Sequence, residues 1–313
     1  MSRTAPISLI IVTYNNKIDT IKSCVESVLA SNPKPKEIII VDNGYNPGIS
    51  SLVRKIELKH YKHILLLKNK DNMGFSKGIN KGMEMASQKY YVLLNPDTKI
   101  INHASFGEIL KCHINKQAGI VGGICIDDNG NRHNSFYRLP KALTAIFEFS
   151  NVKRIFPNNN YSKKFYYINE KIKFSSQSFP VEGVSGAFMS IDKRVVEKIG
   201  NLDENYFLYL EDIDFCTRAQ KHKIKVYVCP NAVAFHRGGE SSEKKRGRIN
   251  YNAWVKSRYY FFSKNLKCIE QLIVLPIFSI DTLINRIINY FRDYNNPNLK
   301  KIQTISNQNK KYL

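Results

Sequence analysis

Apolar runs alternate with helix-patterned stretches through the first third of the chain. The runs are short, rich in aliphatic residues and each ends in a polar turn; they span residues 7–12, 37–41, 64–67 and 90–94. Such runs are predicted to be strands buried on both faces, as in a parallel sheet covered by helices. The alternation therefore predicts an α/β fold with a Rossmann-like, mostly parallel central sheet flanked by helices.

Polar side chains follow each of these predicted strands. Asn15, Asp42, Asn72 and Asp97 come after the first, second, third and fourth run in turn. Ligands of open α/β sheets bind at the carboxyl ends of the strands, where these side chains would gather. Because asparagine and aspartate are also common in turns, an ordinary turn is an alternative for each position taken alone.

Three carboxylates crowd into four residues after an aromatic run at residues 206–210. Glu211, Asp212 and Asp214 open a stretch in which apolar residues have helical spacing. Crowding of like charges raises the pKa of one carboxyl group, which suits a general base. Acidic residues are also common in the first turn of a helix, so a capping role is open as well.

The middle of the chain carries weaker signals. Residues 134–180 show little periodicity and are predicted to be a loop-rich insertion, while residues 127–131 are predicted to be a hairpin turn rather than a metal site. Small side chains at residues 185–187 interrupt an apolar strand and indicate a bulge or a close backbone approach. His236 ends another apolar run, and both a structural role and metal ligation are open for it.

The charge is strongly positive and unevenly distributed. The net charge is +22, and residues 244–313 hold 14 Lys and Arg against 3 Asp and Glu. Nucleic acid, an anionic membrane surface or phosphorylated substrates would each suit such a chain. Residues 249–265 are aromatic and basic, and residues 269–291 are apolar with a break at Pro276. This is typical of amphipathic helices on a bilayer, and also of helices packed on a domain.

Length, hydropathy and cysteine usage indicate how the chain divides into domains and in which cellular compartment it works. No run of about 18 uninterrupted apolar residues occurs, so no transmembrane helix is predicted. The six cysteines are scattered without a CxxC pair and no signal-peptide pattern is seen, which favours a reducing cytoplasm. We expect a catalytic domain at residues 1–241 and a basic helical tail at residues 242–313, of which only about the last dozen residues are predicted to be disordered.

Seven short motifs carry a resemblance to a known family. They lie, in order, at residues 10–15, 40–44, 72–80, 94–97, 184–188, 211–214 and 235–241. Each is weak alone, but together they make the chain resemble glycosyltransferase family 2, the inverting enzymes with the GT-A fold. The chain looks most similar to the rhamnosyltransferase-like branch of bacterial polysaccharide biosynthesis, which includes O-antigen and capsule assembly.

The resemblance implies a role for each motif residue at the donor nucleotide. Thr13, Tyr14 and Asn15 would line the nucleotide pocket, and Asp42 would accept a hydrogen bond from a pyrimidine base. Asn72 and Gly74 would border the ribose or the base.

The resemblance also implies a divalent metal, Mn²⁺ or Mg²⁺, on the donor diphosphate. Asp97 matches the last residue of the family's DxD-type motif, and His236 resembles a later metal ligand of some members. The first carboxylate of that motif is replaced here by Asn95. Asparagine can hydrogen-bond a ribose hydroxyl but is a poorer ligand for a hard cation.

Asp212 matches the family's catalytic base, and Glu211 or Asp214 would orient the acceptor or tune that base. The implied reaction moves a sugar from a nucleotide donor, with dTDP-rhamnose as the best guess and UDP-linked hexoses as the alternative. The implied acceptor is a saccharide on a polyprenyl diphosphate, with residues 134–180 facing it. Such an enzyme would associate peripherally with the inner face of the cytoplasmic membrane.

Three other classes are open to a chain of this composition. A dinucleotide-dependent oxidoreductase would need GxGxxG after the first strand, where residues 13–16 read Thr-Tyr-Asn-Asn instead. A non-enzymatic protein that binds membranes or nucleic acid would leave Asp97 and Asp212 unexplained, and no nucleic-acid partner is expected. An inactive family member is disfavoured because both aspartates are present.

Overall fold

The computed structural model describes residues 4–44, 46–59, 61, 63–132, 135–168, 177–236 and 247–294. Residues 237–241 of the last family motif and the end of the chain predicted to be disordered lie outside these ranges. The chain divides into two compact units. The sheet unit comprises residues 1–140 and 163–261, and the helical unit comprises residues 141–162 and 262–313.

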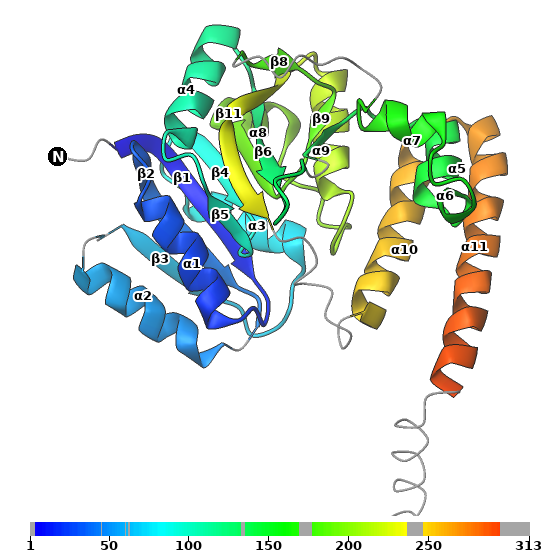
Figure 1. Ribbon diagram of the computed structural model, residues 1–313, viewed down its shortest axis with the longest axis horizontal. Helices are drawn as coiled ribbons and strands as arrows, with labels where there is room; N and C mark the ends of the chain where they lie inside the picture. Colours follow the sequence, from blue (N-terminus) through cyan, green and yellow to red (C-terminus); the bar gives the residue numbers. More distant parts are fainter. Residues whose placement is uncertain are drawn as a thin grey trace, which may run out of the picture. The chain divides into compact units, whose positions relative to one another are not determined.

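Among the described residues, nine strands of the sheet unit form one sheet, in the order β3-β2-β1-β4-β10-β6-β11-β5 with β8 beside β11 (Figure 1). Strands β3, β2, β1 and β4 run parallel, β10 is antiparallel to both of its neighbours, and β6 and β11 are parallel to each other. The bounds are β1 Thr4–Thr13, β2 Lys34–Asp42, β3 Ile64–Lys68, β4 Tyr90–Leu94, β5 Thr98–Ile100, β6 Ile120–Ile126, β8 Phe179–Pro180, β10 Phe188–Asp192 and β11 Val226–His236. The predicted fold class, a mostly parallel α/β sheet, is confirmed.

Helices cover both faces of this sheet, which is why its strands are apolar throughout. In β1, Leu9 and Ile11 belong to one hydrophobic cluster, while Ile10 and Val12 belong to the other. Side chains of α1, α2 and α4 complete the first cluster, and side chains of α3, α8 and α9 complete the second. The bounds are α1 Ile18–Leu29, α2 Pro47–Lys59, α3 Phe75–Met85, α4 Ser105–Lys116, α8 Lys193–Ile199 and α9 Glu211–Lys221.

The hairpin turn at residues 127–131 is confirmed. The Asp127 carboxylate accepts hydrogen bonds from the backbone N–H groups of Asn129 and Asn131, at 2.9 and 2.8 Å. The Asp127 N–H bonds to the Asn131 carbonyl, which closes the turn. Asp127 therefore serves the turn.

The prediction of a loop-rich insertion at residues 134–180 is wrong for its described part. That part contains β7 Phe136–Tyr137, which pairs with β9 Gly183–Val184, and the helices α5 Ala142–Phe149, α6 Val152–Ile155 and α7 Asn160–Phe165. These helices are too short for a clear period, and aromatic packing holds them. The Phe147 ring stacks on Tyr161 at 4.8 Å between centroids and contacts Phe156 at 6.3 Å.

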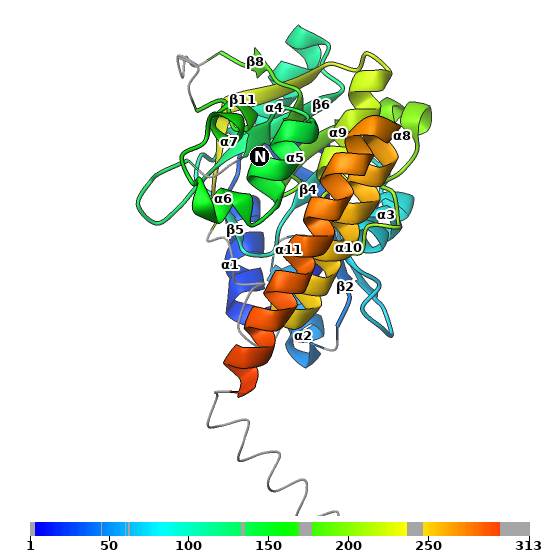
Figure 2. The ribbon, with the colours of Figure 1, turned by 90° about the vertical axis from the view of Figure 1, so that its right-hand side faces the viewer.

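The C-terminal region forms α10 Gly247–Asn265 and α11 Cys268–Tyr294. The predicted break at Pro276 is wrong, because α11 runs through it as one ribbon (Figure 2). Val274 and Phe278 are fully buried on either side of the proline, and this packing offsets the missing hydrogen bond. By length and composition alone, Cys268–Ile288 could cross a membrane, with a mean hydropathy of 1.5. The sequence-based expectation of no transmembrane helix required an uninterrupted apolar run, and isolated polar residues interrupt this one.

Candidate active site

The carboxyl ends of β1 and β2 hold Thr13 and Asp42 side by side. The two residues are register partners, and the Thr13 hydroxyl donates a 3.0 Å hydrogen bond to the Asp42 carboxylate. The Gly44 N–H approaches the same oxygen at 3.3 Å. Both Thr13 and Asp42 are buried. The carboxylate of Asp42 is thus fixed at the strand end where a base was predicted to bind.

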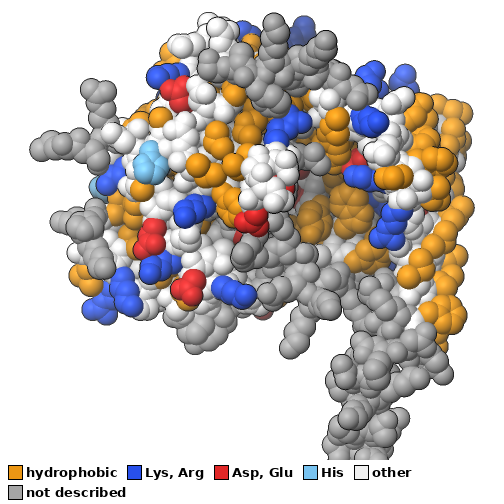
Figure 3. Space-filling view, viewed as in Figure 1, with side chains coloured by type: hydrophobic (Ala, Val, Ile, Leu, Met, Phe, Trp, Pro, Cys, Tyr) orange, Lys and Arg blue, Asp and Glu red, His pale blue; other side chains and the backbone are white. Residues whose placement is uncertain are grey.

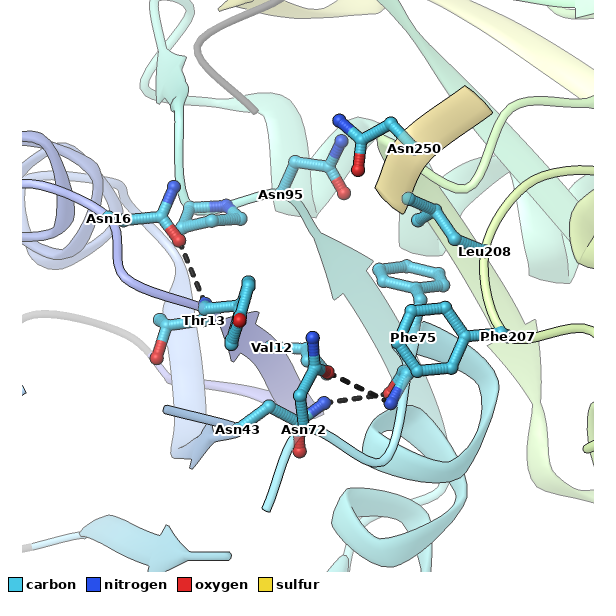
Figure 4. Close-up of a pocket in the computed structure, with 13 residues that line it drawn as sticks. Val12, Thr13, Asn16, Asn43, Asn72, Phe75, Asn95, Phe207, Leu208 and Asn250 are labelled. Atoms are coloured by element: carbon cyan, nitrogen blue, oxygen red, sulfur yellow. Dashed lines mark hydrogen bonds between the residues drawn. The ribbon is translucent and has the colours of Figure 1, made fainter. Parts of the chain in front are cut away.

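The loop before α3 is closed by hydrogen bonds on both sides of Gly74. The Asn72 side chain accepts from the Gly74 N–H at 3.0 Å, and the Asn43 amide donates to the Gly74 carbonyl at 2.7 Å (Figure 4). Gly74 has a φ of +85°, a region that side chains rarely tolerate. A Cβ at this position would lie 2.5 Å from the Phe207 carbonyl oxygen. Glycine is therefore required here by both backbone conformation and space.

The same loop is attached to the aromatic stretch that precedes the carboxylates. The Phe75 N–H donates a 2.7 Å hydrogen bond to the Phe207 carbonyl. Beyond Phe207 the chain bends sharply, because Tyr209 and Leu210 have φ angles of +73° and +68°. Such left-handed conformations are unfavourable for non-glycine residues and cluster at functional sites. The bend delivers Glu211 and the next carboxylate at the start of α9.

Asp212 is half-buried and accepts two backbone hydrogen bonds. Its carboxylate oxygens accept from the Gly186 N–H at 3.0 Å and from the Ile213 N–H at 2.8 Å. Burial raises the pKa of Asp212, while these hydrogen bonds oppose that rise. Among the described residues no cation pairs with this carboxylate, and two hydrogen bonds orient it. Such a group can accept a proton as a general base.

Glu211 is buried beside Asp212. Among the described residues no group hydrogen-bonds its Oε2. Burial, and then repulsion from Asp212, raise the pKa of Glu211 to about 8. Glu211 is therefore largely neutral at neutral pH, which leaves the negative charge of the pair on Asp212.

Asp214 does not fit the role of orienting an acceptor. It is fully buried, pairs with the Arg218 Nε at 2.9 Å and accepts a hydrogen bond from the Tyr206 hydroxyl at 3.3 Å. The Arg218 guanidinium in turn donates to the carbonyls of Ile199 and Asn201. Asp214 therefore ties α9 to its neighbours, and the hypothesis of an acceptor contact for it is wrong.

The two predicted metal ligands come together where β5 pairs with β11. His236 lies opposite Thr98 in that antiparallel pair. Its Nε2 lies 3.3 Å from the Asp97 carboxylate and 3.5 Å from the Asn95 amide nitrogen. Among the described residues, no three or more His, Cys, Asp and Glu side chains are arranged so that they could hold a metal ion by themselves. One imidazole and one buried carboxylate would suit a divalent metal, for which diphosphate oxygens and water would have to supply the remaining ligands.

The segment at residues 185–187 joins the two halves of the site. It forms a turn between β9 and β10, at the point where the sequence indicated a bulge or a close backbone approach. The Gly186 N–H donates to Asp212, and the Ala187 carbonyl accepts from the Asn95 N–H at 3.1 Å. The candidate base and the Asn95-Pro96-Asp97 motif are thus fixed to adjacent residues of one backbone segment.

A pocket opens at these strand ends, and its described lining is neutral. One side is aromatic, with Phe75 and Phe207, and asparagine side chains face the cavity from the other sides (Figure 4). The lining comprises Val12, Thr13, Tyr14, Asn16, Asn43, Asn72, Gly74, Phe75, Asn95, Pro96, Phe207, Leu208 and Asn250. Five predicted nucleotide residues are among them, namely Thr13, Tyr14, Asn72, Gly74 and Asn95. Asn15, Asp42 and Asp97 lie outside this lining.

Several lining residues were missed by the sequence prediction. Asn16 and Asn43 adjoin predicted motif residues, so their position in the motifs could have indicated them. Phe75 also lies within a motif, directly after Gly74, whereas Phe207 and Leu208 look like ordinary core residues in the sequence. Asn250 comes from α10, far along the chain, and no local signal marks it.

The match to known proteins agrees with this geometry. The family model "Glycosyl transferase family 2" matches residues 8–200, which is more than half of the chain. The chain therefore belongs to glycosyl transferase family 2 and is a glycosyltransferase. Glu211, Asp212 and His236 lie beyond the matched residues, so their roles depend on the geometry above.

Curated relatives are similar over most of their length. The low-salt glycan biosynthesis hexosyltransferase Agl10 of Haloferax volcanii is 23% identical, over 83% of this chain and 75% of the relative. The dTDP-rhamnosyl transferase RfbF of Shigella flexneri is 26% identical, over 82% and 77%. The N-acetylglucosaminyl-diphospho-decaprenol L-rhamnosyltransferase of Mycobacterium tuberculosis is 24% identical, over 76% and 78%.

Solved structures show the same fold. The mannosyltransferase PcManGT of Pyrobaculum calidifontis, in complex with GDP-Man and Mn²⁺, has a TM-score of 0.57 at 12% identity, over 88% of this chain and 71% of its own. GalNAc-T7 with UDP, GalNAc and Mn²⁺ has a TM-score of 0.56 at 12% identity, and this chain covers only 43% of it. At such low identity the likeness shows the GT-A fold alone, and that fold prediction is confirmed.

Proposed function

We propose that this enzyme moves a sugar from a nucleoside diphosphate to a hydroxyl of a saccharide acceptor, with inversion, and that Asp212 is the general base. The observation that carries this proposal is the shared attachment of Asp212 and Asn95 to residues 186 and 187. Through this attachment the candidate base lies next to the motif that binds donors in the family. Among the described residues no cation pairs with the base. Such a pair of groups is what a single displacement at an anomeric carbon needs.

The chemistry follows from the protonation of the two carboxyl groups. As the acceptor hydroxyl attacks, its proton passes to Asp212, and the bond to the nucleoside diphosphate breaks on the opposite face. A neutral Glu211 keeps the charge on Asp212 and adds no second negative charge. One well-placed base contributes about 10²–10⁴-fold to such a reaction. Asp97 and His236 would hold Mn²⁺ or Mg²⁺, which offsets the charge that develops on the leaving diphosphate.

We assign the nucleoside to the neutral pocket. Thr13, Tyr14, Asn72, Gly74 and Asn95 line it, and Asn95 would hydrogen-bond a ribose hydroxyl. Asn15 and Asp42 would act from its border, with Asp42 oriented by its bond to Thr13. The preferred donor is dTDP-rhamnose, and a UDP-linked hexose is the alternative. The name of the Shigella relative supports dTDP-rhamnose, and the name of the mycobacterial relative supports rhamnose as the sugar.

We propose a saccharide on a polyprenyl diphosphate as acceptor, in the assembly of a cell-surface polysaccharide such as O-antigen or capsule. The name of the mycobacterial relative, which includes diphospho-decaprenol, supports this class. The enzyme would then work peripherally at the inner face of the cytoplasmic membrane, held there through residues 242–313.

Calorimetric titration with dTDP, UDP and GDP, with and without Mn²⁺ or Mg²⁺, tests the donor site. We expect one nucleotide to bind more tightly with metal, which narrows the donor to the sugars of that nucleotide. Asp212→Asn should then lose transfer by about 10²-fold or more while nucleotide affinity is kept. Absence of binding for all three nucleotides, or near wild-type transfer by Asp212→Asn, would contradict the proposal.

A further inference from the structure

Helix α11 has an apolar face that the described structure leaves exposed. We call this face the apolar stripe. Its side chains recur at three- and four-residue spacing and are 44–73% exposed. They are Ile269, Leu272, Ile273, Ile280, Leu283, Ile284, Ile287, Ile288 and Phe291. Figure 3 shows hydrophobic side chains along the length of α11. Residues 269–291 span about 33 Å at the rise of an α-helix, so the stripe is long as well as wide.

The opposite face of α11 is buried and partly polar. Phe278 packs edge-on against Phe262 at 5.4 Å between ring centroids. The Asp281 carboxylate accepts a 2.7 Å hydrogen bond from the Asn151 N–H, at the start of α6. Asp281 and Thr282 are both buried. Within the helical unit, α11 is therefore fixed by contacts that need this face to stay on protein.

These contacts make a bilayer-spanning position for α11 costly, although its length and composition would suit one. A spanning helix is surrounded by lipid unless other protein covers it, and an ionisable side chain such as Asp281 is costly there. The Asp281 bond to Asn151 would have to break, or residues 141–162 would have to enter the membrane too. A helix with one apolar and one protein-bound face instead suits the surface of a bilayer.

Basic side chains accompany the stripe. Lys264 and Lys267 are exposed just before α11, and Arg286 is exposed on α11 itself. Arg154 of α6 is exposed and reaches Asn285 at 3.5 Å. Each Lys or Arg near an anionic leaflet contributes roughly fivefold in affinity. The charge of this surface therefore complements acidic headgroups rather than another copy of the same basic chain.

We propose that α11 lies in the plane of an anionic phospholipid monolayer, with the apolar stripe at the boundary of headgroups and acyl chains. The proposal rests on the peripheral membrane association proposed above and specifies the element and its orientation. A helix pair would need only a narrow seam of apolar residues, whereas this stripe is wide, as in helices that lie on lipid.

Depth of insertion distinguishes an in-plane helix from a spanning one. In a background where the single tryptophan, Trp254, is replaced by phenylalanine, tryptophan would be placed in turn at Ile273, Ile280 and Ile287. Vesicles of phosphatidylglycerol and phosphatidylcholine would carry bromine at a shallow or a deep acyl position. We expect strong shallow quenching, equal at all three sites. Deep quenching that is strongest at Ile280, near the middle of the apolar segment, would show a spanning helix and overturn the proposal.

Vesicle co-sedimentation tests the stripe itself. The triple variant Ile273→Gln, Ile280→Gln, Ile287→Gln should lose at least about 100-fold in partitioning to anionic vesicles, from the apolar surface removed. The matched control, Leu58→Gln, Met85→Gln, Ile114→Gln, removes three apolar side chains of the sheet unit that are at least as exposed in sum, and it should bind as wild type. Equal binding of both variants, or a dimer in light scattering that only the stripe variant dissociates, would overturn the proposal. Nucleotide calorimetry on both variants should be unchanged, so failure here is separable from failure of the transferase site.

Discussion

Replacement of Gly74 by alanine should separate the donor loop from the base. The added Cβ would lie 2.5 Å from the Phe207 carbonyl oxygen, closer than real contacts allow. Phe207 must move, and its 2.7 Å hydrogen bond to the Phe75 N–H is then lost. The backbone conformation costs about 1–3 kcal/mol for a non-glycine residue. The lost hydrogen bond adds about 1 kcal/mol.

The displacement reaches the base because the chain from Phe207 to Asp212 is only five residues long and sharply bent. A shift of about 1 Å in a catalytic group lowers the rate by about 10²-fold. We therefore expect kcat of Gly74→Ala to fall about 100-fold. The Tm should fall by roughly 5–15 °C, in proportion to the loss of stability. Transfer, or donor hydrolysis without acceptor, gives kcat, and thermal melting gives Tm.

Gly130→Ala is the matched control. Gly130 also has a positive φ, +75°, but nothing lies within 4 Å of its added Cβ. It lies in the hairpin turn at residues 127–131. Its replacement therefore carries the cost of a positive φ for a non-glycine residue but causes no steric clash. Its kcat should stay near wild type. If Gly74→Ala lost no more activity than Gly130→Ala, the coupling of the donor loop to Asp212 would be refuted.

Three further predictions concern the buried charges. Glu211→Gln should raise Tm over wild type increasingly as pH rises from about 5 to 9, because the raised pKa of Glu211 stabilises the fold only while the carboxyl is protonated; a Tm difference independent of pH would contradict this. Asp97→Ala and His236→Ala should each remove the gain in nucleotide affinity that metal gives while leaving metal-free binding intact, which calorimetry measures. Arg218→Met should destabilise the fold by about 3 kcal/mol in urea melts, because Asp214 is left buried without its cation; an unchanged midpoint would argue against that ion pair.

Sequence could predict those segments whose residues all lie in the same kind of surroundings. The strands at residues 7–12 and 90–94 are apolar at every position because helices cover both faces of the sheet. Their polar ends follow from the same geometry, so Thr13 and Asn95 could be predicted to lie at the carboxyl ends of strands, where both line the pocket. The helices at residues 142–165 were missed because contacts between aromatic rings stabilise them. They are too short to show a helical spacing of apolar residues in the sequence.

The part of the site that sequence could not predict depends on distant segments. Asn250 reaches the pocket from a helix that follows the whole sheet in the chain. Asp214 resembled its neighbour Asp212, yet one turns to Arg218 and the other to Gly186. Their spacing in sequence is two residues, and only the direction of each side chain at the start of α9 separates their roles.

The neutrality of the pocket lining has a consequence for how the two ends of a donor would be held. Amides and aromatic rings bind through hydrogen bonds and contact area, which salt affects little, whereas a diphosphate is held by charge and is screened by ions. Nucleoside affinity should therefore be nearly constant with ionic strength, while the additional affinity contributed by the diphosphate should decline. The rate at which the nucleotide product is released would then depend on the contacts of its phosphates. Ionic strength would therefore change the turnover rate without changing which base is recognised.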